Sequence, residues 1–300
     1  MARKTDHLVL EGFDYVKNLP CYEGNLNDRD FPILMSNDRV PESKLWVCTV
    51  SGRITKEDSD AVANEKMGKS LLHTHAVNSA YLLMGEPDAV TAEITLGHDK
   101  YTLKTPSAVF VPAGMPHSIR PLHAQEGLWG AVTKVHYGGM YEVQPALVSF
   151  DVQEDTRQYI VEGYRWSSEL SAHKGSVGDK GYPIMLSTDF MPTSQTWICP
   201  AMVLRTPEIC EAINSGKGAG ATPHYHDNGD EMYLILGEEN CVTLKILLDH
   251  EEHFVKPPAA VYMPLNITHA LEGVHAEPGK YGGPCGLFFG ERYNPIPIKN

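Results

Sequence analysis

The sequence predicts an all-β protein made of two tandem jelly-roll β-barrels, one in residues 1–150 and the other in residues 151–300. Two observations carry this prediction: an internal repeat that spans most of the chain, and a close succession of short strands within each copy. The 26 glycines and 21 prolines are scattered along the chain, as expected for many strands joined by turns.

The repeat is visible as segments of similar sequence that recur at a nearly constant distance. Phe31–Asp38 aligns with Tyr182–Asp189 at a shift of 151 residues, and Gly85 aligns with Gly237 at a shift of 152. The register holds over more than 100 residues, with one extra residue in the second copy. Tandem duplication of one domain, joined near residues 148–155, explains this pattern.

Short apolar runs bounded by turn residues predict the strands. Tyr81–Met84 and Met232–Leu236 are each followed directly by a glycine, and Val90–Leu96 partly alternates apolar with polar residues. Many such runs at short spacing are typical of a jelly-roll barrel or sandwich. The best helix candidates are Asp58–Lys69 and Pro207–Ser215, which we expect at the periphery.

Composition and charge favour a cytoplasmic protein that does not bind nucleic acid. The formal net charge of −13 and the lack of a basic cluster argue against nucleic acid as a partner. No apolar stretch is long enough to cross a membrane, and the first residues lack the apolar core of a signal peptide. The six cysteines show no CxxC pair, so we expect reduced, buried thiols.

The second copy contains a spacing of histidines that is typical of a metal site. Residues two apart in a strand point to the same side, so His224 and His226 present their imidazoles together. Glu231 begins the next strand, and His269 follows a later one. Three neutral imidazoles and one carboxylate suit Fe(II), Mn(II), Zn(II), Ni(II) or Co(II). Asp230 competes for the carboxylate role, but the alignment of the strand favours Glu231.

These motifs resemble those of the cupin superfamily. Its first motif is His-x-His, three or four residues, Glu, six residues and Gly, and its second is Pro-x-Gly, two residues and His. In the second copy Gly237 comes one position early, and Asn266 replaces the glycine of the second motif within Pro264–His269. Asparagine also tolerates the left-handed backbone of such a turn. The resemblance implies a bicupin with a metal held by His224, His226, Glu231 and His269.

The first copy departs from the cupin pattern at one ligand. His73, His75 and His117 are present, but Ser79 stands at the position of the glutamate, with Asn78 beside it. Three histidines can hold a metal, and Asn78 can add a weak oxygen ligand, so this is a second, weaker candidate site. The alternative is a degenerate, structural barrel, which the loss of a negative charge favours.

The cupin fold hosts many reactions, so the resemblance alone does not define one. Our leading hypothesis is a non-haem Fe(II) dioxygenase acting on a small phenolic or oxygenated substrate that chelates the metal, with Mn(II), Zn(II) and Ni(II) as alternative metals. The first alternative is a non-redox decarboxylase, lyase or isomerase, in which the metal is a Lewis acid. The second is a ligand-binding or sensor protein without turnover. No catalytic residue beyond the metal ligands is predicted, and the resemblance implies a homo-oligomer.

Overall fold

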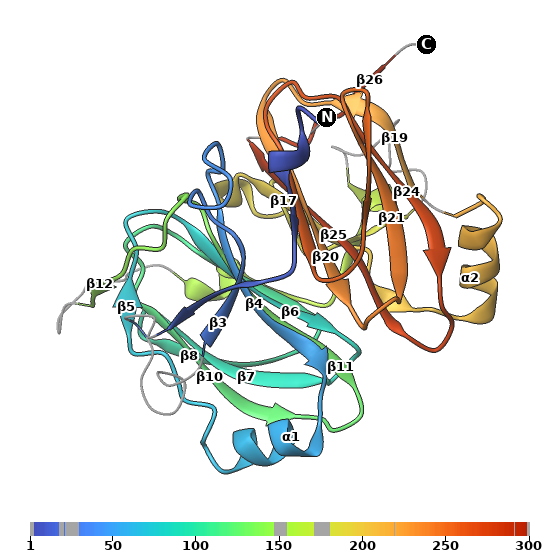
Figure 1. Ribbon diagram of the computed structural model, residues 1–300. Coiled ribbons are helices and arrows are strands. Elements are labelled where there is room, and N and C mark those ends of the chain that lie inside the picture. The colour runs from blue at the N-terminus through green and yellow to red at the C-terminus, as the bar shows by residue number, and fades with distance from the viewer. Residues whose placement is uncertain are drawn as a thin grey trace. The chain divides into compact units, whose positions relative to one another are not determined.

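The computed structural model describes residues 3–17, 21, 30–146, 155–170, 181–218, 220–290 and 292–298. These residues are mostly in β-strands, and the predicted all-β class is confirmed (Figure 1). The chain forms two compact units. The N-terminal unit comprises Asp14–Gly163, and the C-terminal unit comprises Met1–Phe13 together with Tyr164–Asn300.

The N-terminal unit contains two antiparallel sheets. The larger has the order β13-β9-β6-β11-β4-β3-β2 and the smaller has the order β12-β5-β10-β7-β8. The strands of the larger sheet are β2 (Asp14–Lys17), β3 (Asp30–Met35), β4 (Trp46–Arg53), β6 (Ser79–Gly85), β9 (Ser107–Val111), β11 (Trp129–His136) and β13 (Ile160–Glu162). Those of the smaller sheet are β5 (His73–Thr74), β7 (Val90–Leu96), β8 (Asp99–Lys104), β10 (His117–Ala124) and β12 (Gln144–Pro145).

The C-terminal unit repeats this arrangement. Its larger sheet has the order β1-β23-β20-β25-β17-β16, with β18 also on β25, and its smaller sheet has the order β22-β21-β24-β19-β26. The larger sheet consists of β1 (Val9–Glu11), β16 (Leu186–Ser187), β17 (Thr196–Pro200), β18 (Val203–Leu204), β20 (Gly229–Gly237), β23 (Ala259–Met263) and β25 (Tyr281–Gly290). The smaller consists of β19 (Gly220–Tyr225), β21 (Val242–Leu248), β22 (Glu251–Val255), β24 (His269–Ala276) and β26 (Ile296–Pro297), and a separate hairpin pairs β14 (Arg165–Trp166) with β15 (Pro183–Ile184).

The boundaries of the units differ from the expected division at residues 1–150 and 151–300. Strand β1 pairs with β23 of the C-terminal unit, with Val9 opposite Val261. Strand β13 pairs with β9 of the N-terminal unit, with Ile160 opposite Val109. In both cases the short strand satisfies backbone groups along the free side of a sheet strand. The expected junction at residues 148–155 lies almost entirely outside the described residues.

The strands at the centre of each unit are buried on both sides or on alternate sides. Every residue of β6, β9 and β23 is buried, whereas β7 and β21 alternate between buried and half-buried side chains. This alternation matches a strand with one side facing the interior. All six cysteines are buried and free, as expected for small apolar side chains.

The helices are short and peripheral. Helix α1 (Lys56–Ala63) begins after Thr55, whose hydroxyl accepts a hydrogen bond from the Asp58 backbone, and α2 (Pro207–Asn214) begins after Thr206 in the same way. None of the helices in the described part of the chain has the length and apolarity needed to cross a bilayer. The 3-10 helices in the described part of the chain are Asp6–Leu8, Thr156–Tyr159, Ser167–Glu169 and Pro192–Ser194.

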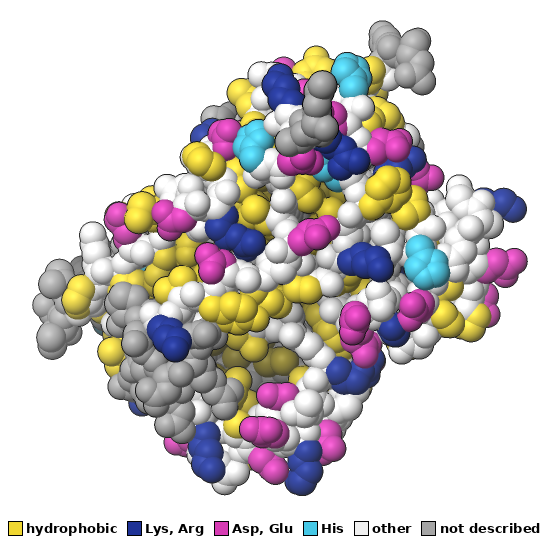
Figure 2. Space-filling view, in the orientation of Figure 1, with side chains coloured by type: hydrophobic (Ala, Val, Ile, Leu, Met, Phe, Trp, Pro, Cys, Tyr) yellow, Lys and Arg dark blue, Asp and Glu magenta, His cyan; other side chains and the backbone are white. Residues whose placement is uncertain are grey.

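Charged side chains of both signs are interspersed on the face of the molecule seen in Figure 2. Some of them form exposed ion pairs, such as Lys104 with Asp88 at 2.9 Å and Lys245 with Glu272 at 2.8 Å. Exposed pairs of this kind contribute about 0–1 kcal/mol each to stability.

Candidate metal centre

The strands of the C-terminal unit bring together the four residues of the predicted metal site. His224 in β19 pairs directly with His269 at the start of β24, and His226 follows β19. Glu231 lies on β20 of the other sheet. All four side chains are buried, and their ligand atoms lie within 4.8 Å of one another.

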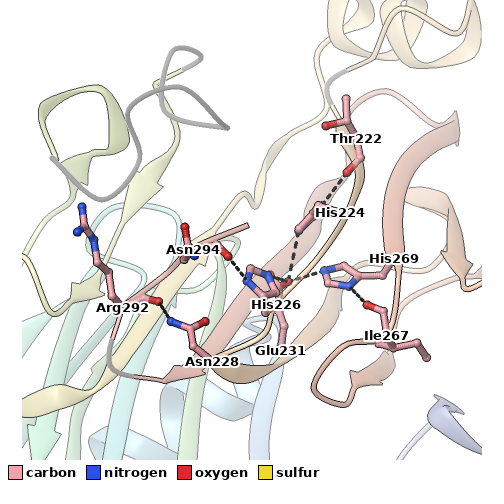
Figure 3. Close-up of polar contacts among 9 residues, drawn as sticks. All are labelled: Thr222, His224, His226, Asn228, Glu231, Ile267, His269, Arg292 and Asn294. Atoms are coloured by element: carbon pink, nitrogen blue, oxygen red, sulfur yellow. Dashed lines mark hydrogen bonds and ion pairs between the residues drawn. The ribbon is translucent and has the colours of Figure 1, made fainter. Parts of the chain in front are cut away.

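The Glu231 carboxylate lies among the three imidazoles (Figure 3). Its Oε2 atom is 2.7 Å from His269 Nε2 and 3.0 Å from His226 Nε2. The corresponding distance to His224 Nε2 is 3.8 Å, and this nitrogen has no hydrogen-bond partner among the described residues. A buried nitrogen without a partner that faces a carboxylate is an appropriate ligand for a cation.

The opposite nitrogen of each imidazole is held by a backbone carbonyl. His224 Nδ1 is 2.7 Å, His269 Nδ1 3.1 Å and His226 Nδ1 3.2 Å from the carbonyl oxygen that it contacts. A carbonyl only accepts, so each Nδ1 is a donor, and in the neutral imidazole the lone pair of Nε2 then faces the centre of the cluster. The donor set therefore fits a divalent metal. The carbonyls belong to Thr222, Ile267 and Asn294.

The pKa shifts follow from burial and from the one negative charge in the cluster. Burial opposes ionisation of Glu231, but the favourable interactions of the carboxylate with the three imidazoles outweigh it and hold the pKa of the carboxyl well below its usual value. Burial also disfavours protonation of His224, yet the interaction with the nearby Glu231 carboxylate raises the pKa of that imidazole. For His269 burial prevails over Glu231, and the pKa is lowered. Glu231 is thus available as an anionic ligand.

Asp230, the competing carboxylate, has a different role. Its Oδ2 accepts a hydrogen bond from the Tyr262 hydroxyl at 2.8 Å, and its Oδ1 accepts one from the Leu265 backbone at 2.8 Å. These bonds hold the turn that precedes His269. Asn266 in this turn has φ of 66°, the left-handed conformation expected from its replacement of a glycine.

A cavity of about 400 Å³ extends from Glu231 into the interior of the C-terminal unit. Its walls are largely apolar and include Trp197 and Tyr293, whose rings stack at a centroid distance of 4.2 Å. Tyr293 also packs on His226, with centroids 5.1 Å apart. Sequence analysis did not identify Tyr293, although it aligns with Tyr141 of the first copy and so shares the repeat.

Arg205 is the other charged residue in the cavity wall. Its side chain is only 6% exposed, and its Nε has no hydrogen-bond partner among the described residues. The corresponding residue in the first copy is Ile54, since the backbone bond from Arg205 to Lys280 matches that from Ile54 to Leu128. Comparison of the two copies at this position could have identified the arginine from the sequence.

The N-terminal unit also assembles its predicted histidines. His73, His75 and His117 are buried, and their ligand atoms are close enough to hold a metal. However, Nζ of Lys134 lies between them, 3.1 Å from His73 Nε2, 2.7 Å from His75 Nε2 and 3.4 Å from His117 Nε2. Burial lowers the pKa of this lysine to about 7. Sequence analysis did not single out Lys134, a lone charged residue in an otherwise mostly apolar strand.

The two residues at the glutamate position of the first copy do not contribute a ligand in this arrangement. The Asn78 side-chain oxygen accepts a hydrogen bond from the Ala113 backbone at 2.9 Å, as Asp230 does from Leu265 in the second copy. Ser79 is fully buried, and its hydroxyl has no hydrogen-bond partner among the described residues.

No family model and no curated protein matches the sequence. Solved structures do match. Oxalate decarboxylase from Bacillus subtilis has a TM-score of 0.59 and 11% identity, covering 99% of this chain and 80% of that chain. A second structure of that enzyme, described with its Mn(II) centres, has a TM-score of 0.56 and 13% identity over 99% of this chain and 82% of that one. AerE from Microcystis aeruginosa has a TM-score of 0.51 and 8% identity, covering 94% and 98%.

At such low sequence identities, the similarity to these structures shows only that the folds are alike. The chain has the two-unit jelly-roll fold of a bicupin, as its motifs predicted. Within that fold, the four buried ligands of the C-terminal unit form a site suited to a divalent metal.

Proposed function

We propose that the protein is a metal-dependent enzyme whose C-terminal unit acts on a small molecule with an apolar body and metal-binding oxygen atoms. The observation that carries this proposal is the position of one member of the ligand set: Glu231 lies in the wall of a largely apolar cavity of about 400 Å³. A pocket of this size accommodates a ring-sized substrate. His224, His226, Glu231 and His269 would hold the metal.

We further propose that the reaction is an oxygenation that depends on iron. Iron(II) held by these four residues would supply redox chemistry with dioxygen. The protein orients the three imidazoles through their Nδ1 hydrogen bonds and limits water near the site with an apolar wall. The aromatic side chains Trp197, Tyr233 and Tyr293 in that wall favour a flat phenolic substrate.

Arg205 favours a substrate that carries a carboxylate. A buried guanidinium Nε without an acceptor is unfavourable in the free protein, and a carboxylate can engage a guanidinium through two parallel hydrogen bonds. The same observation supports a second candidate function, a non-redox decarboxylase, since its substrate must carry a carboxylate. The structures of oxalate decarboxylase share the fold at 10–13% identity and are compatible with this candidate.

A metal exchange separates the two reactions. Protein reloaded with Fe(II) without air, then exposed to air with small phenols and aromatic acids, should consume dioxygen in step with substrate. Zinc has no accessible redox change and should occupy the same ligands without turnover. Undiminished turnover of the zinc protein without air would contradict oxygenation and support non-redox chemistry.

A further inference from the structure

The N-terminal unit contains a buried amine at the centre of its three histidines. Lys134 Nζ lies between 2.7 and 3.4 Å from all three Nε2 atoms, and 3.2 Å from the hydroxyls of both Tyr81 and Tyr141. The lysine is 5% exposed. A lysine amine is a compact group that is strongly hydrated in water, so its burial requires a set of polar partners such as this one.

The imidazoles are oriented toward the amine. His73 Nδ1 is 2.7 Å from the Leu71 carbonyl and His117 Nδ1 is 2.9 Å from the Met115 carbonyl, while His75 Nδ1 contacts the Glu142 carbonyl. Each Nδ1 is therefore the donor, and each Nε2 directs its lone pair at the centre. This is the orientation that the metal ligands have in the C-terminal unit, with an amine at the position where the lone pairs converge.

Sheet register shows which residues of the two units correspond. Lys134 in β11 is opposite Cys48 of β4 and Tyr81 of β6. Gly286 in β25 is opposite Cys199 of β17 and Tyr233 of β20 in the same way. Lys134 and Gly286 are therefore equivalent positions.

The same comparison makes Ser79 the equivalent of Glu231. Ser79 lies opposite His136, and Glu231 lies opposite Phe288, the counterpart of His136. The two differences are coupled in space. A Cβ atom added at Gly286 would lie 3.7 Å from the nearer Glu231 carboxylate oxygen. The unit with a carboxylate has a glycine at the neighbouring position, and the unit without the carboxylate has a cationic side chain there.

We infer that Lys134 takes the place of the metal ion in the N-terminal unit, so that this unit is closed to divalent metals and needs none. The amine occupies the space between the three lone pairs in either protonation state, and its ammonium form has three hydrogen atoms, one for each lone pair. When protonated it also repels a second cation. This inference does not depend on the reaction proposed for the C-terminal unit.

Zinc binding by variants of the full chain tests the inference. In a parent with His224 and His226 both changed to Ala, which keeps only Glu231 and His269 of the C-terminal site, equilibrium dialysis against Zn(II) should find no tight metal while Lys134 is intact. Adding Lys134→Gly should raise bound zinc from about zero to about one per chain, since three imidazoles then form an open zinc site. Adding Ser79→Glu as well should tighten that site. Lys134→Arg, which keeps a cation, should bind no zinc.

Two outcomes would overturn the inference. One is tight zinc in the parent that disappears on changing His73 to Ala. The other is a folded Lys134→Gly, Ser79→Glu variant, verified by circular dichroism and thermal unfolding, that binds no zinc. If that variant does not fold, the parent still decides the question, because its zinc content with and without His73 is measured without altering Lys134.

Discussion

At the scale of single residues, the two units share a common framework and differ at a few chemically decisive positions. A tryptophan–tyrosine stack lies beside each histidine cluster, with centroids 4.4 Å apart for Trp46 and Tyr141 and 4.2 Å apart for Trp197 and Tyr293. Against this constant background, Arg205 of the cavity replaces an isoleucine.

Replacing Arg205 by Ile, the residue at the corresponding position of the other copy, should weaken the binding of a carboxylated substrate. The metal content should be unchanged. Loss of a hydrogen bond to a charged group costs about 1.5–3 kcal/mol, or roughly 10- to 150-fold in kcat/KM. Steady-state kinetics on acids and their matched amides or esters, together with metal analysis, measure this effect. The amides and esters serve as the control, because they should be affected much less.

An equal loss for the neutral analogues would show that Arg205 supports the fold of the cavity and does not bind the substrate anion. An unchanged kcat/KM of the Arg205→Ile variant for the acids would contradict the proposed class of carboxylated substrates.

At the scale of elements, the turn between β23 and β24 positions His269. Asp230 on β20 holds this turn through its bond to the Leu265 backbone, and Asn266 adopts the left-handed conformation within it. Three elements thus converge on one ligand, and Asp230 stabilises the ligand without contacting the metal position. Groups that orient a ligand in this way affect metal affinity about 10- to 100-fold.

Changing Asp230 to Ala should therefore weaken metal binding by about 10- to 100-fold while leaving all four ligands in place. Competition with a chelator, followed by absorbance, measures the affinity. Asn78→Ala is the matched control, because Asn78 holds the equivalent turn in the N-terminal unit through the Ala113 backbone. The control should lower stability without changing the metal affinity. Equal effects of the two changes would refute a specific role for Asp230.

Helices and strands were predicted well where a local sequence pattern defines them. The residue at which an element ends was predicted less well, because it depends on local hydrogen bonds and backbone conformation. The strands and both helices were expected, but α1 ends at Ala63, before the predicted Lys69. The Asn64 side chain donates to the Asp60 carbonyl, and Glu65 has φ of 55°, so the backbone leaves the helical conformation there.

At the scale of the whole molecule, the duplication and the C-terminal ligand set were visible in the sequence because spacing encodes them. His-x-His places two imidazoles on one side of a strand whatever the rest of the fold does. The pairing of β1 with β23 could not be predicted, since Val9 and Val261 are distant in sequence and carry no mutual signal. Lys134 could not be recognised from the sequence as a neighbour of His73, His75 and His117, because this requires the register of β11 in the sheet.

The central claim is that one metal is bound per chain, in the C-terminal unit. Elemental analysis of protein purified without chelator and reloaded with Fe(II) tests it most directly, on the wild type and on the matched variants His224→Ala and His73→Ala. We expect about one metal in the wild type, almost none in His224→Ala and about one in His73→Ala, because only the first change removes a ligand of the complete site. Full metal content in His224→Ala, or its loss in a folded His73→Ala protein, would contradict the account.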